Sequence, residues 1–317
     1  MTRLQRALVL GANGQDGSYL VDHLLAQGWA VTGVGRQEVS RRGGEVERNY
    51  RYIQADIADQ RCIFDLLSGL SPDYVFHAAA THGMAGFVYE DVWDKVLQVN
   101  TQSVLAVLEY LRRNSGCGLC YISSSKVFGV LDGAQINEMS RKHSNCLYTI
   151  SKNTSHDLIN YYRVKHAVNA SVVWTFNHES PRRGAEYFIP RLAQALVNAE
   201  LNPSHYETFE RLGFWGNWGA ASEYMKILVD LADRQVFDDF ILASSHTVWA
   251  EHLVQELFEA RHLDWKNHIR VKTPSEEILP PPFSVDLSKI QQLNGHPPIQ
   301  RVRDVTEEIV RSLQLKR

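Results

Sequence analysis

A glycine-rich turn near the N-terminus places strict demands on the fold. A short apolar run at residues 7–10 leads directly into the sequence GANGQDG at 11–17, and Leu20, Leu24 and Leu25 follow at helical spacing. A second apolar run completes a strand–helix–strand unit, in which such glycines let backbone approach a phosphate at a helix N-terminus. The pattern predicts a dinucleotide site. The residues of this turn that we expect to contact the cofactor are Gly11, Asn13, Gly14, Gln15, Asp16 and Gly17.

Strand-like and helix-like segments alternate along residues 1–175. This order predicts an α/β fold built on a doubly wound parallel sheet of the Rossmann type, which binds ligands at the carboxyl ends of its strands. The further strands are predicted at residues 29–34, 52–55, 73–80, 118–122 and 170–174. The residues at strand ends that we expect to contact the cofactor are Asp56, Ile57, Ala78 and Ala79.

One long helix is predicted for residues 92–113, in which apolar residues recur at core spacing. Asn100 falls inside it. Because a buried asparagine must be hydrogen-bonded, we expect its side chain to clamp a loop or a structural water.

The character of the sequence changes after Trp174, where polar and aromatic-glycine loops replace the regular alternation. We predict that residues 1–175 form the dinucleotide-binding domain. Residues 176–236 and 245–317 are predicted to form a smaller C-terminal α/β domain for the substrate. A strand near residues 237–244 is expected to return to the main sheet.

The overall composition is that of an ordinary globular protein, with 44% hydrophobic and 22% charged residues. A net charge of −3 gives no indication of a nucleic-acid or membrane partner. No apolar run is long enough to span a bilayer, and no signal peptide is recognisable, so the cytoplasm is the expected location. Four cysteines in 317 residues do not indicate a disulfide framework, and no metal site is predicted.

Arg36 follows the second strand, roughly twenty residues beyond the glycines, where a site selective for NAD places an acidic residue. An arginine there favours the 2′-phosphate of NADP, and Arg41 and Arg42 add positive charge. Glu38 lies close enough that NAD stays possible. We therefore predict NADP as the cofactor, with NAD as the alternative.

Tyr148 and Lys152 are four residues apart and would share one face of a helix. A nearby ammonium group favours the phenolate, so we expect it to lower the pKa of Tyr148 toward neutrality. Such a tyrosine can move a proton on and off a sugar or alcohol oxygen. The spacing alone is common on exposed helices, and it gains meaning from the glycine turn.

Several motifs together resemble the extended short-chain dehydrogenase/reductases and, within them, the GDP-mannose 4,6-dehydratase family. The resemblance is carried by GQDGSYL at 14–20, by Asp56 with Asp59, by Ala78-Ala79, by Tyr148 with Lys152, and by FNHESPRRG at 176–184. These motifs extend over most of the chain.

The resemblance implies a reaction in which hydride leaves sugar C4, water is eliminated across C5 and C6, and hydride returns to C6. Tyr148 would be the base at C4, and Lys152 would support it and bind the nicotinamide ribose. Ser124 would hydrogen-bond the C4 oxygen, where charge develops. The family places a glutamate that removes the C5 proton at the position of Lys126, and an ammonium cannot accept a proton unless its pKa falls strongly.

The substrate half departs further from the family. Gly216 and Leu192 occupy positions where the resemblance leads us to expect basic residues that hold the nucleotide diphosphate. Charge-assisted contacts of this kind are worth about 1.5–3 kcal/mol each, so a substrate other than GDP-mannose is expected. The candidate substrate-binding residues are Asn177, Arg182, Arg191 and Tyr224.

Three functions are consistent with these residues. The first is an NADP-dependent nucleotide-sugar 4,6-dehydratase (a lyase) with an altered substrate. The second is a nucleotide-sugar 4-ketoreductase or epimerase, which needs no glutamate at position 126. The third is a dinucleotide-binding sensor without catalysis, against which the intact Ser124, Tyr148 and Lys152 argue. The resemblance also implies a homodimer or homotetramer that pairs through helices at 92–113 and 148–165.

Overall fold

The computed structural model describes residues 4–42, 48–83, 86–129, 134–274 and 283–316. Its centre is a seven-stranded sheet in the order β11-β7-β5-β4-β1-β2-β3, in which every pairing is parallel. The predicted doubly wound α/β fold is thus confirmed, and the strand order reverses direction between β1 and β4. The strands are β1 (Arg6–Leu10), β2 (Ala30–Gly35), β3 (Tyr50–Gln54), β4 (Tyr74–His77), β5 (Gly118–Ser124), β7 (Asn169–Thr175) and β11 (Phe240–Leu242).

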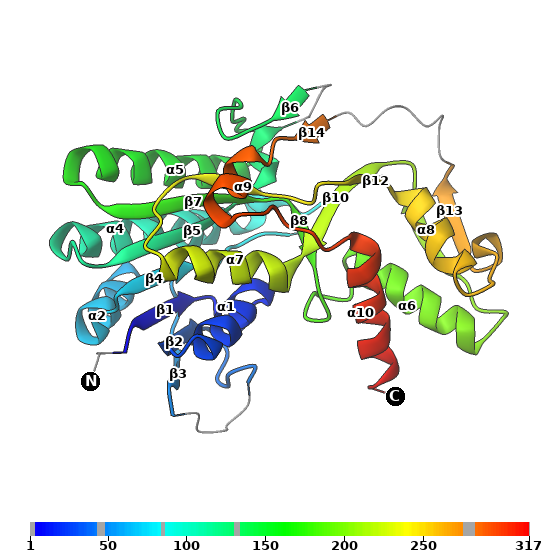
Figure 1. Ribbon diagram of the computed structural model, residues 1–317, viewed down its shortest axis with the longest axis horizontal. Helices are drawn as coiled ribbons and strands as arrows, with labels where there is room; N and C mark the ends of the chain where they lie inside the picture. The colour runs from blue at the N-terminus through cyan, green and yellow to red at the C-terminus, as the bar shows by residue number, and fades with distance from the viewer. Residues whose placement is uncertain (1–3, 43–47, 84–85, 130–133, 275–282, 317) are drawn as a thin grey trace.

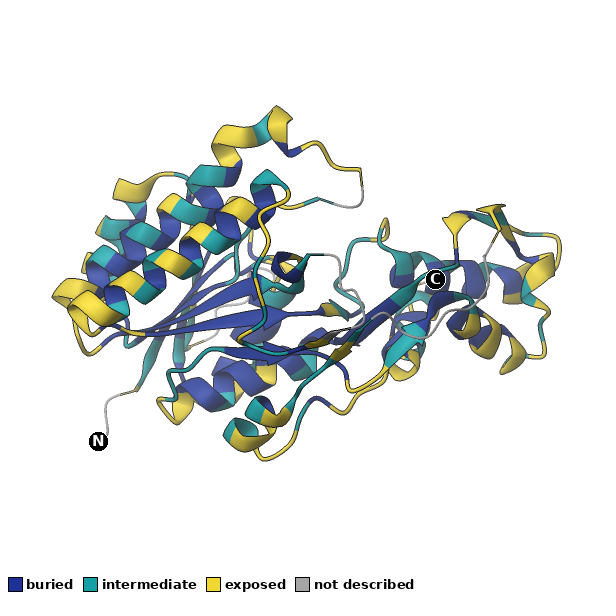
Figure 2. Cartoon of the chain, turned by 90° about the horizontal axis from the view of Figure 1, so that it is seen from above, coloured by how far each residue is buried: buried dark blue, intermediate teal, exposed yellow. Residues whose placement is uncertain are grey.

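Helices cover both faces of the sheet (Figure 1). One face carries α1 (Gln15–Ala26) and α7 (Ala221–Asp233), and the other carries α2 (Gln60–Leu70), α4 (Ser103–Arg113) and α5 (Leu147–His166). Figure 2 shows the buried strands between these two layers, whose outer surfaces are exposed. Among the described helices, none has the length and apolar character that crossing a membrane requires.

The short apolar run at the N-terminus is buried on both sides, as expected for a strand inside a parallel sheet. Ala7 and Val9 point into the core beneath α1 and α7, whereas Leu8 and Leu10 point into the core beneath α2, α4 and α5. The strand thus leads directly from the middle of the sheet into the glycine turn.

The prediction of one continuous helix over residues 92–113 is wrong, although most of this region is helical. The structure divides this region into a 3₁₀ turn (Tyr89–Val92), α3 (Trp93–Leu97), a π-helical turn (Gln98–Gln102) and α4. Asn100 lies in the π turn and clamps a loop, because its Oδ1 accepts the Thr81 N–H at 2.7 Å and its Nδ2 donates to the Thr81 carbonyl at 3.1 Å. Its own carbonyl accepts the Ser155 hydroxyl at 2.7 Å, which helps to hold the widened turn against α5.

A smaller lobe lies beyond the carboxyl ends of the strands and has its own apolar core (Figure 1). Its helices are α6 (Phe188–Leu201), α8 (Ala250–Glu259) and α10 (Val302–Gln314), with a 3₁₀ turn at Trp265–Asn267. Its strands are β8 (Asn177–Glu179), β9 (Glu207–Arg211), β10 (Trp215–Ala220), β12 (Thr247–Trp249) and β13 (Ile269–Thr273). The remaining elements beside the main sheet are a 3₁₀ turn (Ser125–Phe128), β6 (Ala134–Ile136), β14 (Phe283–Val285) and α9 (Ser288–Asn294).

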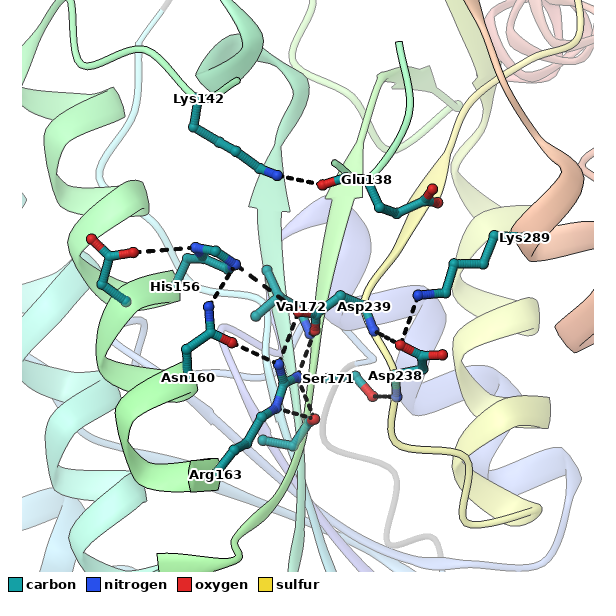
Figure 3. Close-up of polar contacts among 12 residues, drawn as sticks. Glu138, Lys142, His156, Asn160, Arg163, Ser171, Val172, Asp238, Asp239 and Lys289 are labelled. Atoms are coloured by element: carbon teal, nitrogen blue, oxygen red, sulfur yellow. Dashed lines mark hydrogen bonds and ion pairs between the residues drawn. The ribbon is translucent and has the colours of Figure 1, made fainter. Parts of the chain in front are cut away.

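The chain returns from the smaller lobe to the main sheet with α7 and then adds β11, which pairs with β7. A polar cluster holds this returning segment in place (Figure 3). Asp239 forms an ion pair with Arg163 of α5 at 2.5 Å and also accepts the Val172 N–H at 2.7 Å. Glu138 accepts the Ile241 N–H at 3.0 Å. The edge strand is therefore fixed by charges supplied from segments that precede the smaller lobe.

Candidate active site

A cavity of about 860 Å³ lies between the carboxyl ends of the strands and the smaller lobe. It begins at the glycine turn, where β1 and β4 mark the reversal of strand order, and it extends to α6 and β9 of the smaller lobe. Parallel α/β sheets bind their ligands at this position. The two ends of the cavity differ in character.

The glycine turn is closed by contacts that leave no room for side chains. Gly11 has φ +90°, and a Cβ there would lie 2.8 Å from the Ala79 backbone nitrogen. A Cβ on Gly17 would lie 2.1 Å from the Gly11 carbonyl oxygen, so Gly17 packs the helix against the turn and does not line the cavity. The residues of the turn that line the cavity are Gly11, Asn13, Gly14, Gln15 and Asp16.

Asp16 is held by an ion pair that the sequence did not reveal. Its Oδ1 lies 2.8 Å from Nε2 of His178, whose Nδ1 lies 2.7 Å from the Phe176 carbonyl oxygen. Burial alone would raise the pKa of Asp16, but His178 lowers it to about 2, and the same pair raises the pKa of His178. The pair ties the start of α1 to β8 and thereby joins the cofactor end of the cavity to the smaller lobe.

The other predicted cofactor residues also line this end of the cavity. Arg36 is exposed there at the end of β2, and its carbonyl accepts the Gln54 amide at 3.1 Å. Glu38, the acidic neighbour, is not among the lining residues. The predicted residues at the ends of the strands are all present, namely Asp56, Ile57, Ala78 and Ala79. The tight glycine cradle and the small Ala78-Ala79 wall fit a dinucleotide.

Ser124, Tyr148 and Lys152 meet in the middle of the cavity. β5 ends at Ser124, whose side-chain oxygen caps the following 3₁₀ turn at 3.2 Å from the Lys126 N–H and also hydrogen-bonds Tyr148. Lys152 Nζ lies 5.8 Å from the centre of the Tyr148 ring and donates to the Ile122 carbonyl at 2.8 Å. Helical spacing therefore places the tyrosine and the lysine at the same wall.

The expected lowering of the Tyr148 pKa is wrong for this structure. Burial raises the pKa of Tyr148, and the Ser124 hydrogen bond only partly opposes that shift. Burial also lowers the pKa of Lys152 to about 7, because its ammonium loses water. Each group is therefore driven toward its neutral form, and the lysine carries less positive charge than the sequence argument assumed.

Lys126 is exposed in the cavity, with its Nζ 5.7 Å from the centre of the Tyr148 ring. Its confinement among protein atoms, reinforced by the positive charge of Arg183, lowers its pKa. Lys126 is carried by the 3₁₀ turn after β5, and it lines the cavity together with Tyr148. The candidate catalytic residues named from the sequence are thus gathered within one site.

The structure adds residues that sequence reasoning missed. His82, Glu179 and Tyr187 line the cavity, together with Arg183. Burial raises the pKa of Glu179 to about 7, although Arg183 opposes the shift. The guanidinium of Arg183 stacks 3.6 Å from the centre of the Tyr187 ring. Glu179 belongs to the FNHESPRRG motif at 176–184, and His82 follows the Ala78-Ala79 wall. Arg183 was recognisable from the sequence as one of several arginines that could supply positive charge to the substrate.

The substrate end of the cavity is lined by Asn177, Arg191 and several aromatic side chains. Arg191 forms an ion pair with Glu207 at 2.6 Å and stacks 4.7 Å from the centre of the Phe209 ring. The lining aromatic residues are Phe188, Phe209, Phe214 and Trp218. This end therefore offers a guanidinium group beside flat apolar surfaces.

Two predicted substrate residues do not line the cavity. Arg182 is drawn away by Asp22 of α1, with which it forms an ion pair at 2.5 Å, and it stacks on Tyr19. Tyr224 is fully buried where α7 packs against α1 and the sheet. Arg183 takes the place in the cavity that was expected for Arg182.

A profile of the family described as GDP-mannose 4,6 dehydratase matches residues 8–284 of this sequence. The chain belongs to this family. Among curated members, GDP-mannose 4,6 dehydratase 2 of Caenorhabditis elegans is 26% identical over 251 residues, which cover 75% of this chain and 66% of that protein. The human GDP-mannose 4,6 dehydratase is 26% identical over 280 residues, covering 81% and 71% of the two chains. The chain thus spans about two thirds to three quarters of the length of these GDP-mannose 4,6-dehydratase relatives.

Solved structures share the fold of this GDP-mannose 4,6-dehydratase family member at low sequence identity. A UDP-glucose 4-epimerase from Thermotoga maritima, determined with UDP-glucose, aligns with a TM-score of 0.81 and 18% identity over 98% of this chain and 99% of its own. A dTDP-glucose 4,6-dehydratase from Bacillus anthracis, determined with NAD, aligns with a TM-score of 0.79 and 14% identity, covering 98% and 97%. These likenesses concern the arrangement of helices and strands.

Proposed function

We propose that this protein is an NADP-dependent 4,6-dehydratase that acts on a nucleotide sugar. The observation that carries the proposal is the meeting of Ser124, Tyr148 and Lys152 in the cavity that also contains the glycine turn. A nicotinamide dinucleotide bound there would supply the acceptor for hydride from sugar C4 and the donor that returns it to C6. Family membership supports the same reaction.

The three side chains have complementary roles in oxidation at C4. Tyr148 accepts the proton of the C4 hydroxyl as a phenolate, a form that the positive charge of a bound oxidised nicotinamide would favour over the neutral form of the empty site. Ser124 hydrogen-bonds the C4 oxygen as negative charge develops on it. Lys152, which has a pKa of about 7, supplies positive charge near the phenolate. Lys126 belongs to the elimination of water, because it lies beside Tyr148 at the position where the family resemblance places the elimination residue.

The sugar nucleotide is proposed to differ from GDP-mannose. Leu192 is fully buried in the core of the smaller lobe, and Gly216 lies in β10. Neither residue supplies the positive charge expected from the family resemblance. Arg191 and Asn177 are the lining residues to which we assign the diphosphate and the sugar. The aromatic residues at this end suit the flat nucleotide base.

The test is a panel of GDP-mannose, CDP-glucose, dTDP-glucose and UDP-glucose, each incubated with the protein and a substoichiometric amount of NADP. We expect one of them to give a 4-keto-6-deoxy sugar without net change in NADPH, because dehydration is redox-neutral. In a parallel incubation of a 4-keto-6-deoxy nucleotide sugar with NADPH, consumption of NADPH in an amount equal to the product would instead show a reductase. Absence of conversion and of reduced cofactor with every sugar would refute the proposal.

A 4-ketoreductase or epimerase is the second candidate. Lys126 favours it, because these enzymes need no glutamate at that position. An epimerase would return the hydride to C4 and leave the C6 hydroxyl in place, which product analysis in the same panel detects. A reductase would be recognised by its consumption of NADPH.

Replacement of Arg36 by alanine tests the choice of cofactor. Because a charge-assisted hydrogen bond is worth about 1.5–3 kcal/mol, we expect roughly 10- to 150-fold weaker binding of NADP and little change for NAD. Arg61→Ala, on the exposed surface of α2, is the matched control. Isothermal titration with both dinucleotides measures the effect, and equal losses for NADP and NAD would argue against a 2′-phosphate contact.

A further inference from the structure

Elimination of water requires a proton acceptor that the oxidation step does not use. The C5 hydrogen must leave as a proton, and C5 is bonded directly to C4, whose oxygen faces Tyr148. The acceptor must therefore lie close to Tyr148 in the cavity. We propose that His82 accepts this C5 proton, an inference that rests on the function proposed above.

His82 is placed beside Tyr148 by the loop that follows β4. The centres of the two rings are 6.2 Å apart, and the ring planes meet at 66°. The His82 side chain is exposed and lines the cavity, so a ligand there can reach the imidazole. The loop itself is held by the Asn100 clamp on Thr81, the residue before His82. The imidazole is thus presented from a fixed backbone.

We assign to Tyr187 the selection of the His82 nitrogen that accepts the proton. The Tyr187 oxygen lies 3.5 Å from Nδ1 of His82. When Nδ1 carries the hydrogen and donates it to that oxygen, the lone pair of Nε2 is available to the substrate. Within the part of the chain that the structure describes, Nε2 forms no hydrogen bond. Tyr187 is accordingly assigned as a positioning residue.

The surroundings of His82 keep its imidazole uncharged. Its confinement in the cavity, followed by the positive charges of Arg183, Lys126 and Lys152, lowers its pKa to about 4. Asp16 acts in the opposite direction without reversing the shift. At neutral pH the imidazole is therefore uncharged and holds a free lone pair.

Three other ionisable groups that line the cavity differ from His82 in exposure, partners or charge. Asp16 is paired with His178 at 2.8 Å. Glu179 is only 4% exposed and lies against Arg183, with 3.8 Å between the carboxylate oxygen and Nε. Lys126, when charged, holds a proton that it can give away and has no lone pair with which to accept one.

His82 and Lys126 together balance the elimination. The C5–H bond breaks, the proton moves to Nε2 of His82, and the bonding electrons form a double bond between C5 and C6. The C6–O bond breaks, and the hydroxyl leaves as water after taking a proton from the Lys126 ammonium. After reduction at C6, His82 returns its proton to C5. The proton released from the C4 hydroxyl through Tyr148 restores the Lys126 ammonium.

The experiment uses whichever of the four panel sugars gives reduced cofactor with the wild-type protein. In deuterated water, deuterium incorporation at C5 is compared among the wild type, His82→Ala, His82→Gln and Lys126→Ala. His252→Ala, an exposed histidine of α8 outside the cavity, is the control. Formation of reduced cofactor is recorded for each protein, because it reports the step at C4.

We expect both His82 variants to form reduced cofactor while their C5 incorporation falls by roughly 10²-fold or more. Added imidazole is expected to restore part of the incorporation in His82→Ala, which a purely structural role would not allow. Lys126→Ala is expected to keep C5 incorporation and to lose formation of water. Wild-type incorporation in both His82 variants would overturn the proposal and leave the dehydratase function standing.

A ligand-free measurement tests the charge and tautomer that the proposal requires of His82. Nitrogen NMR of histidine-labelled protein is expected to show His82 uncharged at neutral pH, with the hydrogen on Nδ1. A charged imidazole, or a hydrogen on Nε2 in the wild type, would overturn the assignment. If no panel sugar yields reduced cofactor, the proposed dehydratase function is refuted, and the role of His82, which rests on that function, is refuted as well.

Discussion

Replacement of Tyr148 by phenylalanine is expected to slow hydride transfer from the sugar by roughly 10³-fold, because the reaction loses its positioned proton acceptor. The ring packs against Tyr89, with 5.7 Å between centroids, and phenylalanine preserves that contact. Folding and cofactor binding should therefore be unaffected. Single-turnover formation of reduced cofactor measures the rate, and thermal unfolding with and without NADP checks the protein.

The control for this substitution is Tyr89→Phe. Tyr89 stacks on Tyr148 without lining the cavity, and its hydroxyl accepts the Gly83 N–H at 3.3 Å. Because this oxygen does not face the ligand, its removal should change the rate of hydride transfer from C4 little. A Tyr148→Phe protein that reduced the cofactor at nearly the wild-type rate would show that the C4 proton leaves by another route. The role assigned to Ser124 would then need to be enlarged.

Replacement of Gly11 by alanine is expected to abolish dinucleotide binding and to destabilise the fold. The new Cβ would lie 2.8 Å from the Ala79 backbone nitrogen, and neither backbone segment can move without displacing a central strand. The positive φ adds about 1–2 kcal/mol of conformational strain. Urea unfolding measures the stability, and titration with NADP measures the affinity, which should fall at least ~10²-fold if the loss exceeds about 3 kcal/mol.

Gly28→Ala separates the effect of the contact with Ala79 from the conformational strain of a positive φ. Gly28 also has a positive φ, of +83°, but nothing lies within 4 Å of the position of its Cβ. Only the conformational cost of about 1–2 kcal/mol should appear there, with NADP binding unchanged. Equal losses of stability in the two variants would mean that the close approach to Ala79 is unimportant.

Most of the fold could be predicted because its signals are local. The glycine turn, the apolar runs and their alternation each occupy a few consecutive residues, and together they define a parallel sheet. The π turn at Asn100 could not be predicted, because its cause lies in Thr81 and Ser155, which are distant in sequence. A helix that is regular by periodicity was opened by tertiary hydrogen bonds.

In the candidate site, too, the features with local sequence signals could be predicted and those set by distant residues could not. Ser124, Tyr148 and Lys152 were recognisable by spacing and motif, and the structure gathers them in one cavity. The choice between Arg182 and Arg183 depended on Asp22 of α1, whose proximity no local pattern reveals. The pKa values of Tyr148 and Lys152 could not be predicted either, because they follow from burial rather than from the pair alone.

The path of the chain through β11 has a consequence for synthesis and for engineering. The edge of the sheet at β7 stays uncovered until the polypeptide has passed Leu242, by which point α6 and β10 have already been made. An unpaired strand edge can pair with other chains. The nascent protein is therefore expected to depend on rapid pairing of β11 with β7. The smaller lobe is built from three stretches of chain, separated by α7 with β11 and by β14 with α9. Exchange of the lobe between relatives would need a junction at each crossing, and the junction at β11 would have to preserve the Arg163–Asp239 pair.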